Sequence, residues 1–196
     1  MMRKTFFGIV ALASIVASPA AWAESWYVGG YGGLNYGHDA NSSGGDLVEY
    51  DFPGFAIGGF AGMRFNPHIR FEGELTYRTT DISTINGVGV AGDMASMALV
   101  ASGYYDFSKM GSFTPYAGGG LGIVDAEFTT GGGQWSDTVL ALQLGAGAIF
   151  DLSPGLAASI DYRLLIADDL ALGAGGGFGQ LEYTNSSFLV GIRKSF

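Results

Sequence analysis

The sequence predicts an all-β fold: an eight-stranded antiparallel up-and-down transmembrane β-barrel whose lumen is filled by side chains. Three observations predict it. Apolar and polar residues alternate with a period of two, aromatic residues gather at the ends of the alternating segments, and the connections alternate between short and long. Alternation alone does not say which face is inside, because a soluble barrel turns its apolar face inward and a membrane barrel turns it toward lipid. A soluble core would hold large rings at the strand centres, so aromatic residues at the strand ends place the apolar face outside.

Eight segments carry the alternation, and each is about as long as a tilted transmembrane strand. They are Trp26–Tyr36, Phe55–Phe65, Ile69–Thr79, Ala95–Phe107, Phe113–Ile123, Val139–Phe150, Leu156–Ile166 and Tyr183–Phe196. The connections predicted to be short are Asn66–His68, Ser108–Ser112 and Ser153–Gly155, and those predicted to be long loops are His38–Gly54, Thr80–Met94, Asp125–Thr138 and Ala167–Glu182. Short turns on one side and long loops on the other are typical of a barrel inserted into a membrane from one side.

The N-terminus has the pattern of a secretory signal. Arg3 and Lys4 precede an apolar stretch from Phe6 to Val16, and Ala21 and Ala23 form a small-x-small cleavage site. We therefore expect residues 1–23 to be a cleaved signal peptide and residues 24–196 to be one barrel domain. Cleavage removes two of nine basic residues and leaves seven against 18 acidic, a formal charge of −11. This charge argues against a nucleic-acid partner, whose phosphates need Lys and Arg.

All five arginines after the signal segment fall in the polar, inward phase of the alternation, together with four carboxylates. The predicted lumen network consists of Arg64, Arg70, Glu72, Glu74, Arg78, Asp106, Asp161, Arg163 and Arg193. Buried arginines need charged partners, and these four carboxylates are the nearest by phase. We interpret the network as a set of structural salt bridges that stabilise a narrow barrel, with no catalytic role and no cofactor.

Twelve acidic residues and no lysine or arginine fall in the four segments predicted to be long loops. The densest groups are Asp46, Glu49 and Asp51 in one loop and Asp168 with Asp169 in another. Acidic, glycine-rich loops stay solvated, which is one interpretation. The other is recognition of a cationic or host-surface partner, or of Ca²⁺ or Mg²⁺ shared with lipopolysaccharide phosphates, although neither group has a full metal-binding signature.

The final strand, Phe188-Leu-Val-Gly-Ile-Arg-Lys-Ser-Phe196, resembles the C-terminal signal that the barrel assembly machinery reads, with Gly191 and the terminal Phe196 in place and Lys194 where an aromatic residue is usual. Other segments resemble the small outer-membrane β-barrel family, porin-like or OmpA-like. They are Trp26-Tyr-Val-Gly-Gly, Tyr104-Tyr-Asp-Phe, Thr114-Pro-Tyr-Ala-Gly-Gly-Gly-Leu-Gly and Asp161-Tyr-Arg163. The resemblance covers residues 24–196. It implies a bacterial outer-membrane location, contact with lipid and lipopolysaccharide, and insertion by the assembly machinery.

Three hypotheses for function remain open. The first is a structural or interaction barrel that presents acidic outer loops. The second is a narrow porin-like channel for small solutes, because glycines line part of the inward phase. The third is a lipid-A-modifying enzyme at the outer rim, where His38 and Ser186 lie in the lipid-facing phase of strands that must be neighbours. No motif orients this pair, so we expect the chain not to be an enzyme.

Overall fold

The computed structural model describes residues 25–38, 40–41, 47–50, 54–85, 88–130, 133–171 and 180–196. These residues form ten strands: β1 (Ser25–Gly37), β2 (Ala40–Asn41), β3 (Leu47–Tyr50), β4 (Gly54–Arg64), β5 (Ile69–Ile85), β6 (Val88–Asp106), β7 (Phe113–Thr130), β8 (Gly133–Ser153), β9 (Leu156–Ala171) and β10 (Gln180–Ser195). Within the described ranges, no helix is long and apolar enough to cross a membrane. The predicted signal segment, with Ala21 and Ala23, lies outside the described residues.

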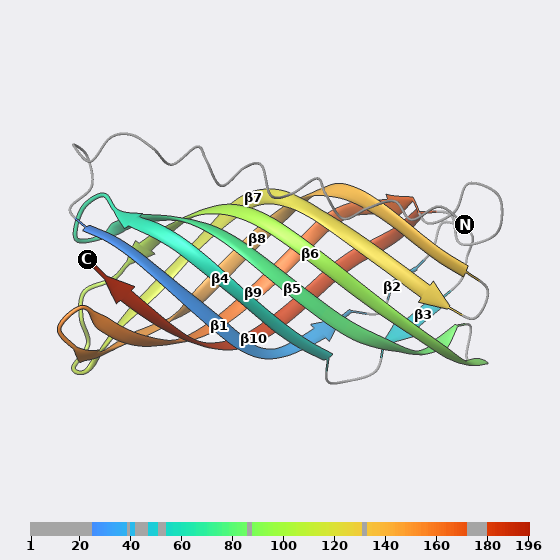
Figure 1. The fold of residues 1–196 in the computed structure, drawn as a ribbon, viewed down its shortest axis with the longest axis horizontal. Coiled ribbons are helices and arrows are strands. Elements are labelled where there is room, and N and C mark those ends of the chain that lie inside the picture. The colour runs from blue at the N-terminus through green and yellow to red at the C-terminus, as the bar shows by residue number, and fades with distance from the viewer. Residues whose placement is uncertain are drawn as a thin grey trace.

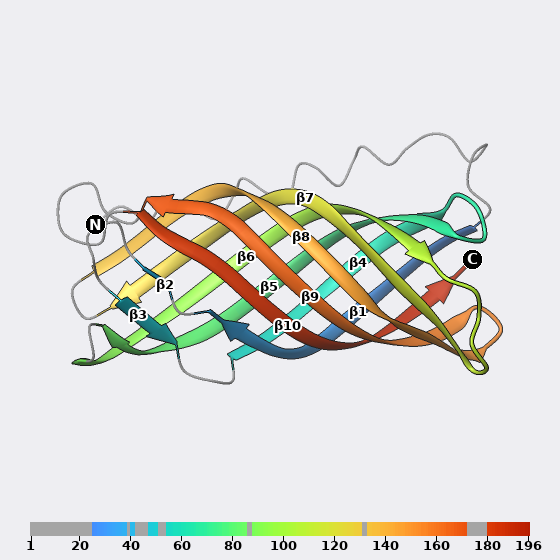
Figure 2. The same ribbon diagram turned by 180° about the vertical axis from the view of Figure 1, so that it is seen from behind.

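Eight of the strands close into a barrel. Each pairs antiparallel with its neighbours in the order β1, β4, β5, β6, β7, β8, β9 and β10, and β10 pairs back to β1. The closing register runs from Tyr27 opposite Ser195 to Gly37 opposite Asn185. Figures 1 and 2 show the strands wrapping at a tilt around the long axis of the molecule. The predicted eight-stranded up-and-down barrel is therefore confirmed, and no barrel strand is left with an unpaired edge.

The two ends of the barrel differ. The short-turn end holds the turns at residues 65–68, 107–112 and 154–155 together with Phe196, as the C label in Figure 1 shows. Gly111 and Gly155 sit in these turns with φ of 64° and 71°, the left-handed region that glycine adopts at little cost. The long-strand end is the opposite one. There β5, β6, β7 and β8 run on together, and β3 pairs with β5.

Two of the four predicted long loops are wrong. Strand β5 continues to Ile85 and β6 begins at Val88, while β7 continues to Thr130 and β8 begins at Gly133. The backbone pairing runs on through the predicted loops, for example Asp81 opposite Asp93. The alternation ends in this region, which is why the sequence predicted loops, although the antiparallel hydrogen-bond ladder needs no apolar face to continue.

Some of the acidic residues are also placed differently from the prediction. Asp168 and Asp169 lie in β9 and Glu49 lies in β3, so these three residues are on strands and not in loops. The reason is backbone pairing, because β9 pairs with β10 as far as Ala171 and β3 pairs with β5. Asp46 and Asp51 fall outside the described residues.

The two faces of the barrel follow the predicted phase, most clearly in β5. Arg70, Glu72, Glu74, Thr76, Arg78 and Thr80 are all buried in the lumen. The residues between them point outward, and Phe71, Leu75 and Tyr77 are exposed. Outward apolar residues on other strands follow the same phase, with Leu121 70% and Leu140 67% exposed. The barrel thus has a polar interior and an apolar outer surface, the inverse of a soluble barrel.

Candidate functional site: the polar lumen

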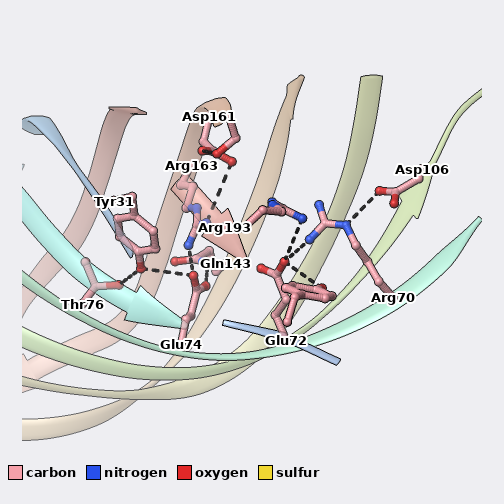
Figure 3. A network of polar contacts seen from close by, with 12 residues as sticks. Tyr31, Arg70, Glu72, Glu74, Thr76, Asp106, Gln143, Asp161, Arg163 and Arg193 are labelled. Atoms are coloured by element: carbon pink, nitrogen blue, oxygen red, sulfur yellow. Dashed lines mark hydrogen bonds and ion pairs between the residues drawn. The ribbon is translucent and has the colours of Figure 1, made fainter. Parts of the chain in front are cut away.

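Strand β5 supplies the central row of the lumen. Its even-numbered positions point inward because side chains alternate along a strand, and they place Arg70, Glu72, Glu74 and Arg78 in line along the axis. Neighbouring strands supply the partners: Asp106 from β6, Asp161 and Arg163 from β9, and Arg193 from β10. Figure 3 shows Arg163 at Glu74, Arg70 and Arg193 at Glu72, and the two aspartates on the outer sides of the arginines.

The first cluster lies toward the short-turn end and is centred on Arg70. Its Nε donates to Asp106 Oδ1 at 2.8 Å, and its Nη1 pairs with Glu72. The guanidinium lies against the rings of Tyr104 and Tyr116, 4.2 Å and 4.3 Å from their centroids. Cation–π contacts of this kind are strongest where water is excluded, so the rings stabilise the buried charge.

Further groups complete the first cluster. The Tyr27 hydroxyl donates to Glu72 Oε1 at 3.0 Å, and Arg193 Nη1 lies 3.7 Å from the same oxygen. At the edge, the partly exposed Arg64 places its Nη2 3.5 Å from Asp106 Oδ2. Three arginines thus share two carboxylates.

The second cluster surrounds Glu74 at the middle of the barrel. Glu74 pairs with Arg163, accepts a hydrogen bond from Gln143 Nε2, and accepts another from the Tyr31 hydroxyl at 3.2 Å. The Arg163 guanidinium lies 4.3 Å from the centroid of the Tyr31 ring. Asp161 is more loosely attached, 3.9 Å from Arg163. Strands β1, β5, β8 and β9 are therefore tied together at one level of the lumen (Figure 3).

Arg78 departs from the expectation that each lumen arginine pairs with a carboxylate. Its Nε donates to Ser187 Oγ at 3.5 Å and its Nη2 to Gln143 Oε1 at 3.3 Å. The cause is position, because Arg78 is four residues beyond Glu74 and about 13 Å further along the strand. The described inward residues around it are neutral, including Thr80 and Asn35, which hydrogen-bond to each other at 2.8 Å.

Inward glycines make room for the lumen rings. A Cβ atom at Gly62 would overlap the Tyr27 ring, and one at Gly58 would lie 2.7 Å and 2.8 Å from two ring carbons of Tyr31. The inward phase of the alternation predicted glycines in the lumen, but Tyr27 and Tyr31 were not among the predicted lumen residues. Their position in the inward phase of β1 was the signal that could have found them.

The C-terminal residues close the barrel next to β1. The backbone N–H of Phe196 donates to the Trp26 carbonyl at 2.9 Å, and the Phe196 side chain is exposed. Gly191 pairs with Tyr31 in β1 and with Ser159 in β9. Of the predicted assembly signal, Gly191 therefore lies in the closing strand and Phe196 directly follows its end.

A family model described as the outer membrane protein beta-barrel domain matches residues 8–196. The chain belongs to this family. In outer-membrane barrels the short turns face the periplasm. The short-turn end is therefore the periplasmic end, the long-strand end lies outside the cell, and the exposed apolar residues between them meet lipid.

Solved structures of other outer-membrane barrels share the fold. Neisserial surface protein A is 21% identical with a TM-score of 0.60, over 87% of this chain and 97% of that one. Outer membrane protein AlkL is 15% identical with a TM-score of 0.55, over 92% and 94%. The N-terminal barrel of OprF from Pseudomonas aeruginosa is 15% identical with a TM-score of 0.51, over 89% and 98%. No curated protein matches the chain.

The outer rim brings His38 and Ser186 together. His38 Nε2 lies 2.8 Å from Ser186 Oγ, and the Tyr162 hydroxyl lies 2.9 Å from the same oxygen. Ser186 is only 5% exposed, so its hydroxyl is covered rather than presented to a substrate. Among the described residues no carboxylate hydrogen-bonds to the His38 ring. The pair therefore links β1, β9 and β10 at the membrane interface, beside the ring contact of Tyr162 with Phe188 at 5.0 Å.

The described side chains give no grouping of three His, Asp or Glu residues that would hold a metal ion. Asp168, one of the predicted oxygen ligands, is exposed. The polar lumen is the most elaborate constellation of charged groups in the described chain, and its geometry is that of a filled, cross-linked core.

Proposed function

We propose that the chain is a structural and interaction barrel of the outer membrane, which does not conduct solutes and presents an acidic surface outside the cell. The filled middle of the lumen carries this proposal. Glu74, Gln143 and Arg78 are at most 1% exposed and are hydrogen-bonded to one another across the barrel. An eight-stranded barrel is just wide enough for side chains to fill it. The filled lumen favours this function over the alternative, a narrow porin-like channel.

Acidic residues on the outer strand extensions support the interaction role. Asp125 and Glu127 on β7 are partly exposed, and Asp168 on β9 is exposed. A cationic partner is attracted to this group of exposed carboxylates, and the attraction weakens as salt screens the charges. We infer that the partner is a lysine- or arginine-rich peptide segment.

The test measures binding of a fluorescent oligolysine peptide to the protein in nanodiscs of zwitterionic lipid, where both barrel ends are accessible. Asp168→Asn should weaken binding about two- to fivefold, the range for one exposed charge pair. Asp151→Asn is the matched control. Asp151 is also exposed but lies at the short-turn end, where Lys109 already pairs with it at 2.5 Å. Equal weakening by the two variants, or binding that does not fall as salt rises, would contradict the interaction role.

A further inference from the structure

The barrel wall splits at its outer end, between β8 and β9. The pairing of these two strands starts at Ala141 opposite Ala167 and runs from there toward the short-turn end. Beyond this pair both strands continue, but β8 stays with β7 as far as Gly133 and β9 stays with β10 as far as Ala171. We call the place where the two strands part the outer seam. Within the described chain, the segment Gly133–Leu140 of β8 is therefore paired on one side only.

A β-bulge in β9 accounts for the split. Leu170 pairs with Leu181 of β10 and Ala167 pairs with Tyr183, so two residues of β9 stand opposite the single residue Glu182. A bulge bends the strand that contains it and often ends a pairing. This bulge begins directly after Ala167, which is where β9 leaves β8. The outer seam is thus built into the register of the strands.

The other edge of the same outer sheet is covered. Strand β5 also continues past its barrel neighbour β4, since their pairing ends at Phe55 opposite Thr79. There β3 takes the place of β4, with Val48 opposite Ile85. Of the two edges of the sheet formed by the outer ends of β5 to β8, only the β8 edge lacks a covering strand among the residues that the structure describes. An uncovered edge is a template for pairing with another chain.

The seam edge of β8 presents backbone hydrogen-bonding groups. The Phe107 N–H donates to the Pro115 carbonyl, so the odd-numbered residues of β7 bond to β6. The even-numbered ones therefore bond to β8, and the register turns the backbone groups of Ser136 and Thr138 toward the seam. The Thr138 N–H donates there to a side chain of its own strand, Asp137 Oδ1, at 2.9 Å. Both edge residues are exposed, so the edge is open to an added strand.

The charges around the outer seam favour a basic strand. Asp168, in the bulge, is exposed, and Asp137 is partly exposed. Asp125 and Glu127 are the β7 residues opposite the two edge residues, and both are partly exposed. No lysine or arginine occurs in the three segments that border the seam, residues 124–130, 133–140 and 167–171.

We propose that the outer seam binds an extended lysine- or arginine-rich peptide, which adds to the β8 edge as a further strand. The peptide backbone hydrogen-bonds to Ser136 and Thr138, and its basic side chains pair with Asp137 and Asp168. Backbone hydrogen bonds supply affinity in this mode of recognition, and the charges select a basic sequence. The inference rests on the proposed function, to which it adds the place and the conformation in which the partner binds.

The test compares two fluorescent peptides on the barrel in nanodiscs of zwitterionic lipid. One is oligolysine, and the other is the same oligolysine N-methylated at every residue, which keeps the charge but has no backbone N–H to donate. The methylated peptide should bind about tenfold more weakly, the effect of losing one or two hydrogen bonds. Thr138→Pro should weaken the binding of oligolysine by a similar factor, because proline removes the N–H on the seam side and leaves the pairing with β7 in place. Ser108→Pro, in an exposed turn at the other end of the barrel, is the matched control and should bind like the wild type.

Amide hydrogen exchange of the wild-type protein, followed by NMR, gives a second test if Thr138→Pro does not fold. Saturating oligolysine should slow exchange of the Ser136 amide about tenfold, while the Ser108 amide stays unchanged. A Ser136 amide already protected in the free protein would show that the chain itself covers the edge, and would overturn the proposal. Equal binding of the two peptides, with Asp168→Asn still weakening both, would overturn the added strand and leave the interaction role standing. Absence of binding by either peptide would contradict both.

Discussion

Glu74→Ala is expected to lower the free energy of unfolding by about 3–5 kcal/mol, the cost of breaking a buried ion pair by removing one partner. Glu74 is 1% exposed and accepts from Arg163, Gln143 and Tyr31 at the middle of the lumen. Without it, the Arg163 charge stays buried with only Asp161 nearby, at 3.9 Å. The measurement is urea unfolding of the protein refolded into lipid vesicles, followed by tryptophan fluorescence.

Two further variants show whether the buried charge is the cause. Glu74→Leu combined with Arg163→Met removes both charges at similar volume and should recover most of the lost stability, because an apolar replacement of a buried ion pair is often neutral. Asp168→Asn, an exposed carboxylate on the same barrel, should change stability by less than about 0.5 kcal/mol. A double variant as unstable as Glu74→Ala would show that the ion pair is not what stabilises the centre.

Gly58→Ala is expected to destabilise the barrel by about 1–3 kcal/mol through overpacking. The new Cβ would lie 2.6 Å from the Leu75 carbonyl oxygen and 2.7 Å from the Tyr31 ring, so the ring must move. Tyr31 cannot move without cost because its hydroxyl contacts Glu74 and, at 2.5 Å, Thr76. The same urea unfolding experiment measures the effect.

Gly73→Ala is the control for this prediction. A Cβ at Gly73, on the outer face of β5, would meet nothing within 4 Å. Alanine there reduces the freedom of the unfolded chain, so it should leave stability unchanged or raise it by about 0.4–1 kcal/mol. The two substitutions are chemically identical, and only Gly58→Ala should lower the stability. A loss of stability of the same size at both positions would contradict the close packing of small and large residues inside the barrel.

The sequence predicted the fold well because its strongest pattern, the alternation of apolar and polar residues, is the one that a membrane barrel requires. A transmembrane strand must present apolar residues to lipid and polar residues to the lumen, so β5 could be predicted at each of its membrane positions. The alternation predicted the strand only as far as Thr79, whereas β5 continues to Ile85 by backbone pairing with β6. Backbone hydrogen bonds extend the strands, and no side-chain pattern in the sequence predicts this extension.

The sequence predicted which residues belong to the lumen network but not which arginine pairs with which carboxylate. The alternation along β5 placed Arg70, Glu72 and Glu74 in the lumen, because moving the strand by one residue would expose all three side chains to lipid. Which arginine meets which carboxylate depends on the stagger between strands, and a single sequence does not contain it. That stagger puts Arg163 beside Glu74 and leaves Arg78 among neutral groups.

The aromatic residues, too, were predicted only in part. The sequence predicts aromatic residues at the strand ends, and the outward Tyr77 and Phe188 are exposed. The inward rings of Tyr27 and Tyr31 were not predicted, because aromatic residues at strand ends indicate contact with the membrane interface and not with the lumen. In the structure these rings face the arginines, which the alternation had already assigned to the same side.

Single-channel recording in planar lipid bilayers tests the filled lumen most directly. Protein that is folded, as judged by a shift in gel migration on boiling, is inserted into the bilayer beside a porin that serves as the positive control. The sealed centre formed by Glu74, Gln143 and Arg78 predicts no discrete current steps from this barrel. Reproducible steps from folded wild-type protein would contradict the filled lumen and would restore the narrow channel as its function.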